Sequence, residues 1–236
     1  MGEVIVRTWN VLSRHFLTFF VLVGITELIP LLITLYPGYT GTVTIVSRTD
    51  AVVFTALLFL LQFILTSFTQ AIVVFAAFQD LRGRPVSAAE SFRQGVSRVF
   101  PVIIASILSG LLIGLGWLFC LIPGLIAMAA MAVVLPACVV ERLGPIQSMS
   151  RSNDLTTGHW WPIIGVGAAW AIIVFVVSLT IRQAMPGAQT LPKQMATWAW
   201  EVVAGTFSSV YAAILYHDLR AVREGIGIDE IASVFD

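Results

Sequence analysis

The feature that most constrains this chain is a series of long apolar runs separated by short polar segments. Uncharged apolar stretches of roughly 18 or more residues are typical of membrane-spanning helices. The runs are continuous and show no alternation of apolar and polar residues, which favours helices over the strands of a barrel. The sequence therefore predicts an all-α, polytopic membrane protein, a single integral membrane domain over residues 1–236. Its six transmembrane helices are expected at 16–36, 51–78, 102–121, 125–140, 163–181 and 198–216.

Charged residues are scarce and balanced in sign. Hydrophobic residues make up 58% of the 236 residues and charged residues only 11%, whereas soluble domains carry about 25% charged residues. The 13 basic and 13 acidic residues cancel, so no basic face for nucleic acid is expected. We therefore expect membrane lipids as partners and no nucleic acid.

The basic residues are unevenly distributed along the predicted topology. The N-terminus, the 79–101 and 141–162 segments and the C-terminal tail fall on one side and hold ten of the 13 basic residues. The other side holds Arg48, Arg182 and Lys193. Because segments rich in Lys and Arg stay in the cytoplasm, both termini are predicted to be cytoplasmic.

Three similar segments close spans 2, 4 and 6: FQDLRG, VVERLG and YHDLRAVREG. Each places an acid at the membrane exit with an arginine one or two positions later. These acid-arginine pairs are Asp80 with Arg82, Glu141 with Arg142, and Asp218 with Arg220. Amphipathic segments at 3–14, 87–99 and 144–157 precede the three pairs of spans, and Pro101 and Pro162 open spans 3 and 5. We predict three repeats of an interfacial helix plus a transmembrane hairpin. Chance similarity is the alternative.

The turn between spans 3 and 4 is expected at Ile122-Pro123-Gly124. The preceding glycines, Gly110, Gly114 and Gly116, predict a close backbone approach to a neighbouring helix.

The polar segment 141–161, ERLGPIQSMSRSNDLTTGHWW, allows two interpretations. It can be a plain interfacial helix that starts at Pro145, a favoured first helical position. Alternatively, it binds an anionic lipid headgroup through guanidinium and hydroxyl donors. The candidate headgroup residues are Arg142, Ser148, Arg151, Ser152, Thr156 and Thr157.

Several ordered motifs together resemble a known family: FQDLRGRPVSAAESFRQGVSRVFPVI, LFCLIPGLIAM, VVLPACVVERLGP, SRSNDLTTGHWWPI and YHDLRAVREGIGID. They look like the bacterial membrane-domain family that includes the membrane portion of some glycerophosphoryl diester phosphodiesterases and the YciC-like inner-membrane proteins. The resemblance implies a six-helix protein of the bacterial cytoplasmic membrane. It does not imply phosphodiesterase activity, because in the fused enzymes catalysis belongs to a separate soluble domain, and nothing of that size is present in these residues.

A few polar residues fall inside the predicted spans, where they are costly and are candidates for function. They are Glu27, Gln62, Gln70, Arg182 and Glu201. One interpretation makes Glu27 and Glu201 a proton or cation path with Arg182 as partner. The other places Glu201 at the interface and leaves Glu27 protonated or hydrogen-bonded between helices.

The sequence contains no phosphate-binding loop, no HExxH and no GxSxG, and its histidines and cysteines lack metal-ligand spacing. We therefore expect no catalytic residues, no metal and no cofactor.

Three hypotheses for the function follow. The protein is a non-enzymatic protein that binds anionic phospholipid or organises the membrane, a small transporter or channel, or a membrane subunit that docks a protein partner. A homo-oligomer is compatible with each of them.

Overall fold

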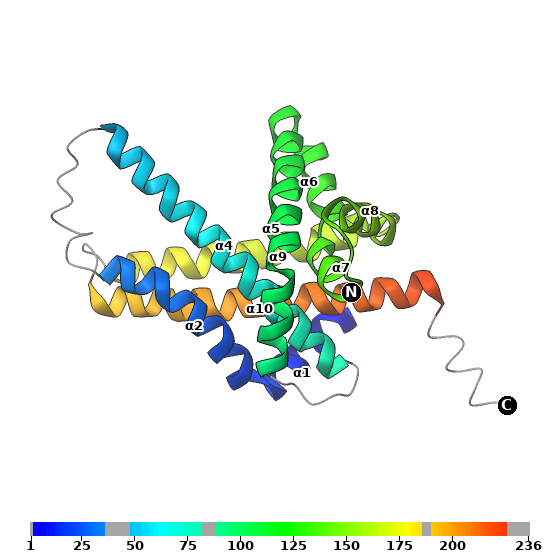
Figure 1. The fold of residues 1–236 in the computed structure, drawn as a ribbon, viewed down its shortest axis with the longest axis horizontal. Coiled ribbons are helices and arrows are strands. Elements are labelled where there is room, and N and C mark those ends of the chain that lie inside the picture. The colour runs from blue at the N-terminus through cyan, green and yellow to red at the C-terminus, as the bar shows by residue number, and fades with distance from the viewer. Residues whose placement is uncertain (1, 36–47, 82–87, 186–189, 226–236) are drawn as a thin grey trace.

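The computed structural model describes residues 2–35, 48–81, 88–185 and 190–225, and all regular secondary structure in these ranges is helical (Figure 1). The helices are α1 (Gly2–Arg14), α2 (Phe16–Leu35), α4 (Arg48–Leu81), α5 (Ala88–Phe119), α6 (Leu121–Ala130), α7 (Val134–Val140), α8 (Pro145–Thr156), α9 (Trp160–Ala184) and α10 (Leu191–Glu224). This confirms the all-α fold class. Among the described residues, five helices are long and apolar enough to cross a membrane, or six if α1 and α2, bent by 82° at their junction, count as one span.

The helices pack closely at one end and diverge at the other. Figure 1 shows the second half of α5, together with α6, standing away from α9 and α10, while the first half of α4 leaves in another direction. The largest fully buried side chains include Phe19, Val73, Val102, Leu155 and Tyr216, which come from five helices and belong to one core cluster. The diverging segments instead expose large apolar side chains, as expected for surfaces that face lipid chains.

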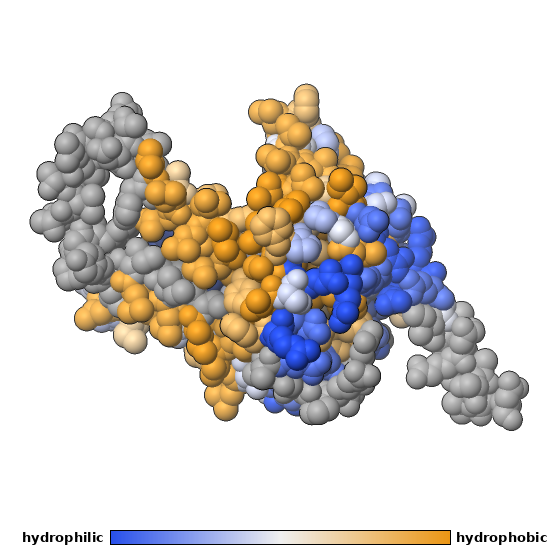
Figure 2. Space-filling model, in the orientation of Figure 1, coloured by the Kyte–Doolittle hydropathy of each residue, from blue (hydrophilic) through white to orange (hydrophobic). Residues whose placement is uncertain are grey.

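We call the closely packed end the polar end. It consists of α1, residues 88–101 of α5, the 141–144 turn, α8 and the last turns of α4 and α10. Figure 2 shows hydrophilic residues gathered around α8 and the lower part of α5, and hydrophobic residues over the diverging arms. This distribution is compatible with a protein whose arms lie in a membrane and whose polar end lies at its surface.

The predicted break between the interfacial segment 87–99 and span 102–121 is absent. Both belong to the continuous helix α5, and Pro101 lies inside it. Proline in a helix interior costs a backbone hydrogen bond, but α5 packs against α4 and is buried on both sides of Pro101. On one side of Pro101, a Cβ atom on Gly95 would lie 2.5 Å from Ile72 Cγ1, and on the other side Val102 and Ala105 are fully buried.

The turn between α5 and α6 falls at Cys120 and not at the predicted Ile122-Pro123-Gly124. Pro123 lies in the first turn of α6, where its missing N–H leaves no helical hydrogen bond unmade. The predicted close approach is confirmed for Gly116, because a Cβ there would lie 2.9 Å from Gly124 Cα. It is wrong for Gly110 and Gly114, which have open space around them.

The predicted span 125–140 is broken into α6 and α7 at residues 131–133. The hydroxyl of Ser152, on α8, lies at this break. Ser152 Oγ donates to the carbonyl of Ala130 at 2.7 Å and accepts from the amide of Val133 at 3.3 Å. A side chain from another helix thus replaces backbone hydrogen bonds that a continuous helix would make.

The helix predicted to begin at Pro145 is confirmed as α8, with proline in its first turn. The amide of Gly144 donates to Gln147 Oε1 at 3.3 Å, which satisfies one free donor at the helix start. The buried residues of α8 are Ser148, Ser152, Leu155 and Thr156. The hydroxyl-bearing face is therefore the one that packs on the protein, and Ile146 is 75% exposed.

We predict that Ser152→Ala destabilises the protein, because it leaves the carbonyl of Ala130 and the amide of Val133 without their hydrogen-bond partner. A buried group left unsatisfied costs about 1–3 kcal/mol, and 1 kcal/mol shifts the midpoint of a domain of this size by about 2–4 °C. The thermal midpoint in mild detergent measures the effect. Ser150→Ala, on the exposed face of α8, is the control, and equal midpoints for the two variants would contradict the role of Ser152.

Candidate functional site at the polar end

The three acids predicted at the helix exits all lie at the polar end, but they pair with residues distant in sequence. Asp80 Oδ1 lies 2.8 Å from His15 Nε2 and 3.8 Å from Arg14. Asp218 Oδ1 accepts a hydrogen bond from Arg7 at 3.0 Å. These contacts fasten α1 to the ends of α4 and α10.

The predicted pairing of each acid with the next arginine in sequence is therefore wrong for Asp218 and for Glu141. Arg220 Nε donates to Glu224 at 2.6 Å and not to Asp218. Arg142, next to Glu141, has no carboxylate within salt-bridge distance (4.0 Å) in the described ranges. Arg82 lies outside the described residues. An arginine two positions after an acid on a helix faces away from it, which explains the mismatch at Asp218.

Glu141 is the centre of a network that joins α7, α8 and α10. Arg151 Nε donates to both carboxylate oxygens of Glu141, at 2.9 and 3.1 Å, and another Arg151 nitrogen donates to Glu224. The hydroxyl of the buried Tyr216 also donates to Glu141. With Arg220 on Glu224, two basic and two acidic groups balance within the network.

Arg151 keeps its charge inside this network. Burial by itself would lower the pKa of Arg151, but the hydrogen bonds that Arg151 donates to Glu224 and Glu141 outweigh burial and raise this pKa. Arg151 is therefore a permanent cation already neutralised by two carboxylates.

The hydroxyl donors predicted for a lipid headgroup point the wrong way for that role. Ser148, Ser152 and Thr156 are 0% exposed. Ser148 Oγ donates to the carbonyl of Gly144 at 2.8 Å, and Thr156 Oγ1 to that of Ser152 at 2.9 Å. Thr157 is exposed but donates to the carbonyl of Asn153 at 2.6 Å. The headgroup site predicted on α8 is thus not assembled, because its hydroxyls and Arg151 bond within the protein.

Of the two predicted headgroup arginines, Arg142 is the one that is exposed and has no carboxylate partner in the described ranges. Its backbone adopts φ +56°, a left-handed conformation that is uncommon outside glycine. The carbonyl of Arg142 accepts a hydrogen bond from Arg98 Nη1, on α5, at 3.4 Å. The 141–144 turn and the first half of α5 are joined at this point.

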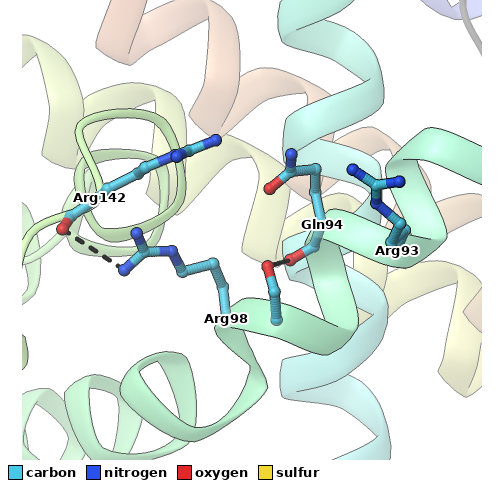
Figure 3. Close-up of a pocket in the computed structure, with 5 residues that line it drawn as sticks. Arg93, Gln94, Arg98 and Arg142 are labelled. Carbon is cyan, nitrogen blue, oxygen red and sulfur yellow. Dashed lines mark hydrogen bonds between the residues drawn. The ribbon is translucent and has the colours of Figure 1, made fainter.

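Arg142 and α5 border a pocket of about 350 Å³, lined by Arg93, Gln94, Ser97, Arg98 and Arg142. We call it the arginine pocket. Figure 3 shows Arg98 reaching the Arg142 carbonyl while the Arg142 side chain extends towards Gln94. Ser97 Oγ donates to the carbonyl of Gln94 at 2.8 Å, which leaves its lone pairs and the Gln94 amide facing this region.

The arginine pocket is strongly positive. Among the residues that the structure describes, no carboxylate lies within 4.0 Å of the guanidinium groups of Arg93, Arg98 or Arg142. The nearest acid in sequence, Glu141, is bound by Arg151. The site can therefore accept an anion through charge-assisted hydrogen bonds from three arginines.

Sequence reasoning missed Arg93 and Arg98. The signal was partly present, because Arg93, Gln94, Ser97 and Arg98 fall at positions i, i+1, i+4 and i+5 and so share one side of a helix. Their convergence with Arg142 depends on packing between segments 44 residues apart.

Two of the polar residues predicted inside the spans do meet. Gln62 Nε2 donates to Glu27 Oε2 at 3.1 Å and lies 3.3 Å from Thr66 Oγ1. Glu27 is only 9% exposed. Glu201 is exposed and close enough to interact electrostatically with both Glu27 and Arg182. Gln70 is half-buried two turns further along α4.

Among the described residues, no group of three or more His, Cys, Asp or Glu side chains could hold a metal ion. Cys120 and Cys138 are free thiols, the first exposed and the second buried.

Each interfacial segment bonds to the exit of a hairpin from the preceding predicted unit. α1 bonds to the end of α10 through Arg7 and Asp218. The start of α5 bonds to the end of α4, where Ser91 Oγ donates to Gln79 Oε1 at 3.3 Å. α8 bonds to Glu141, which follows α7. α1 and α8 also bond within their own predicted units, through Arg14 to Asp80 and through Arg151 to Glu224, so the repeat proposed from sequence stays a prediction.

A family model described as a domain of unknown function, DUF7847, matches residues 85–219. No curated protein and no solved structure matches the chain. The matched range contains the whole arginine pocket together with Glu141, Arg151 and Tyr216. Arg220 and Glu224 follow this range, and Glu27 and Gln62 precede it. The resemblance to the phosphodiesterase membrane domains stays a prediction.

We predict that Glu141→Gln destabilises the polar end, because it removes the charged acceptor of the buried Tyr216 and leaves Arg151 with Glu224 as its remaining carboxylate partner. Loss of a hydrogen bond to a charged group costs about 1.5–3 kcal/mol. The thermal midpoint in detergent should fall, whereas Asp154→Asn, which removes an exposed acid from α8, should leave it unchanged. Equal midpoints for the two variants would show that the network does not hold the helices together.

Proposed function

The chain belongs to the DUF7847 family of domains of unknown function, and we propose that it is a non-enzymatic, multi-pass membrane protein that binds anionic lipid headgroups. The observation that carries the proposal is the arginine pocket: three guanidinium groups without a carboxylate partner among the described residues, at the polar end of a set of apolar helices. Clustered arginines are well suited to phosphate because their planar donors bind two oxygens at once.

An apolar surface beside the pocket favours a lipid over a free anion. Phe92, Val96 and Phe100 are 52%, 49% and 72% exposed and recur every four residues along α5. They therefore form a stripe on the helix face next to Arg93. A lipid with its phosphate in the pocket would have its acyl chains against this stripe. A free anion would leave the stripe without a role.

We place the polar end on the cytoplasmic side of a bacterial inner membrane. Most of the basic residues belong to this end, and basic segments are retained in the cytoplasm. The cytoplasmic leaflet also carries anionic lipid, which juxtamembrane arginines attract. With this orientation, the arginine pocket lies at the leaflet that carries anionic lipid.

Lipid retention in native mass spectrometry tests the proposal. Arg93→Ala/Arg98→Ala should reduce retained anionic phospholipid at least about tenfold, since each charge-assisted hydrogen bond is worth about 1.5–3 kcal/mol. The control Arg182→Ala/Arg223→Ala removes the same charge from exposed arginines outside the pocket. Both double variants must keep the thermal midpoint of the wild type. If they then retain equal amounts of anionic phospholipid, the proposal is overturned.

A small transporter is the second candidate, supported by the hydrogen bond from Gln62 to the buried Glu27. A carboxylate inside a membrane span is typical of proton or ion pathways. It ranks lower because both residues precede the range matched by the family.

In proteoliposomes with an internal pH dye, the transporter hypothesis predicts proton flux that Glu27→Gln abolishes and Gln70→Ala leaves intact. Flux no greater than that of empty liposomes, or full flux in Glu27→Gln, would contradict it.

A further inference from the structure

We propose that the arginine pocket selects a phosphomonoester lipid, one whose headgroup is a terminal phosphate, over phosphodiester lipids. This inference rests on the proposed function, because it assumes that a lipid anion occupies the pocket.

The charge of the pocket favours a doubly charged ligand. A phosphodiester carries one negative charge, whereas a phosphomonoester carries about 1.5–2 at pH 7, since its second pKa lies near 6. The pocket is lined by three arginines, and the neighbouring Glu141 is bound by Arg151. A monoester therefore compensates more of this positive charge than a diester does.

The directions of the donors also favour a terminal phosphate. Arg93 and Arg98 come from α5 and Arg142 from the 141–144 turn, so two separate segments of the chain supply the guanidinium donors that line the pocket (Figure 3). A terminal phosphate presents three equivalent oxygens to donors on different sides, whereas a diester has only two non-bridging oxygens. A diester must also direct its second substituent out between the arginines.

The backbone orients one of these donors before a ligand arrives. The left-handed conformation of Arg142 turns its carbonyl to Arg98, and the guanidinium of Arg98 donates to this carbonyl at 3.4 Å. This preorganisation reduces the ordering cost of binding.

Binding of a phosphomonoester to the pocket should depend on pH through the charge of the ligand. Arginines stay protonated throughout the accessible range. Glu90 is exposed, Glu141 is bound by Arg151, and the thiol of Cys138 lies within electrostatic reach of Arg98. Between about pH 5 and pH 7.5 the arginines stay charged, whereas a phosphomonoester loses its second proton near pH 6, so the ligand gains negative charge as the pH rises.

The experiment titrates the full-length protein in mild detergent with phosphatidic acid, phosphatidylglycerol or phosphatidylcholine in the same detergent, and measures the affinity for each lipid at pH values from about 5 to 7.5. Affinity for phosphatidic acid should exceed that for phosphatidylglycerol. It should also rise at least about threefold with pH as the phosphate loses its second proton near pH 6. Binding to phosphatidylglycerol should be flat with pH.

Two variants assign the effect to the pocket. Arg98→Lys keeps the charge but loses the two-pronged donor, so it should reduce the preference for phosphatidic acid. Arg182→Ala, on α9 far from the pocket in sequence and fold, should bind as wild type does. Both variants must keep the wild-type thermal midpoint.

The outcomes separate this inference from the proposed function. If both anionic lipids bind equally at every pH, and both depend on the pocket arginines, the selectivity is overturned and the lipid-binding function stands. If neither lipid depends on these arginines, both proposals are overturned. If inorganic phosphate at millimolar concentration displaces phosphatidic acid completely, the phosphate is recognised without its acyl chains, and the assignment to a lipid is overturned.

Discussion

The ion pair between Arg151 and Glu141 determines which charges at the polar end remain available. It fixes α8 against the exit of α7, and through Glu224 and Tyr216 it ties both to α10. Because the carboxylate of Glu141 is bound by Arg151, the adjacent Arg142 has no acid to bind in the described part of the chain. The left-handed backbone at Arg142 then directs its carbonyl to Arg98. The adjacent residues Glu141 and Arg142 therefore belong to two different sites: Glu141 to a network in which the charges cancel, and Arg142 to a pocket with excess positive charge.

The same separation explains why α8 is a structural helix and not the binding surface. Its serine and threonine side chains face inward, where Ser152 bridges the break between α6 and α7. Hydroxyls suit this position because they donate and accept at once. A hydroxyl-rich helix with few apolar residues can therefore be buried against protein backbone while its apolar Ile146 stays exposed.

Much of the fold could be predicted from sequence, because the cost of exposing apolar runs to water depends on composition alone. The helices α2, α4, α9 and α10 contain the predicted apolar runs and extend beyond them or match them within a residue. The predictions failed where packing decided the outcome, as at Pro101, which stays inside α5 because residues on both sides of it pack against α4.

The candidate site was less predictable because its contacts join segments far apart in sequence. Arg142 was identified from its polar surroundings, but its partner Arg98 lies 44 residues away. Likewise, Glu141 was recognised as an exit acid, but its bond to Tyr216, 75 residues later, depends on how α10 packs. Local spacing identifies which residues carry charge. Tertiary packing decides which of those charges are cancelled.

The most direct measurement is photo-crosslinking with an anionic phospholipid that carries a diazirine in its headgroup, followed by mapping of the labelled peptides. Binding in the arginine pocket predicts label on residues 93–98 and around Arg142. Label concentrated on α8 or spread evenly over all basic segments would contradict the pocket as the binding site.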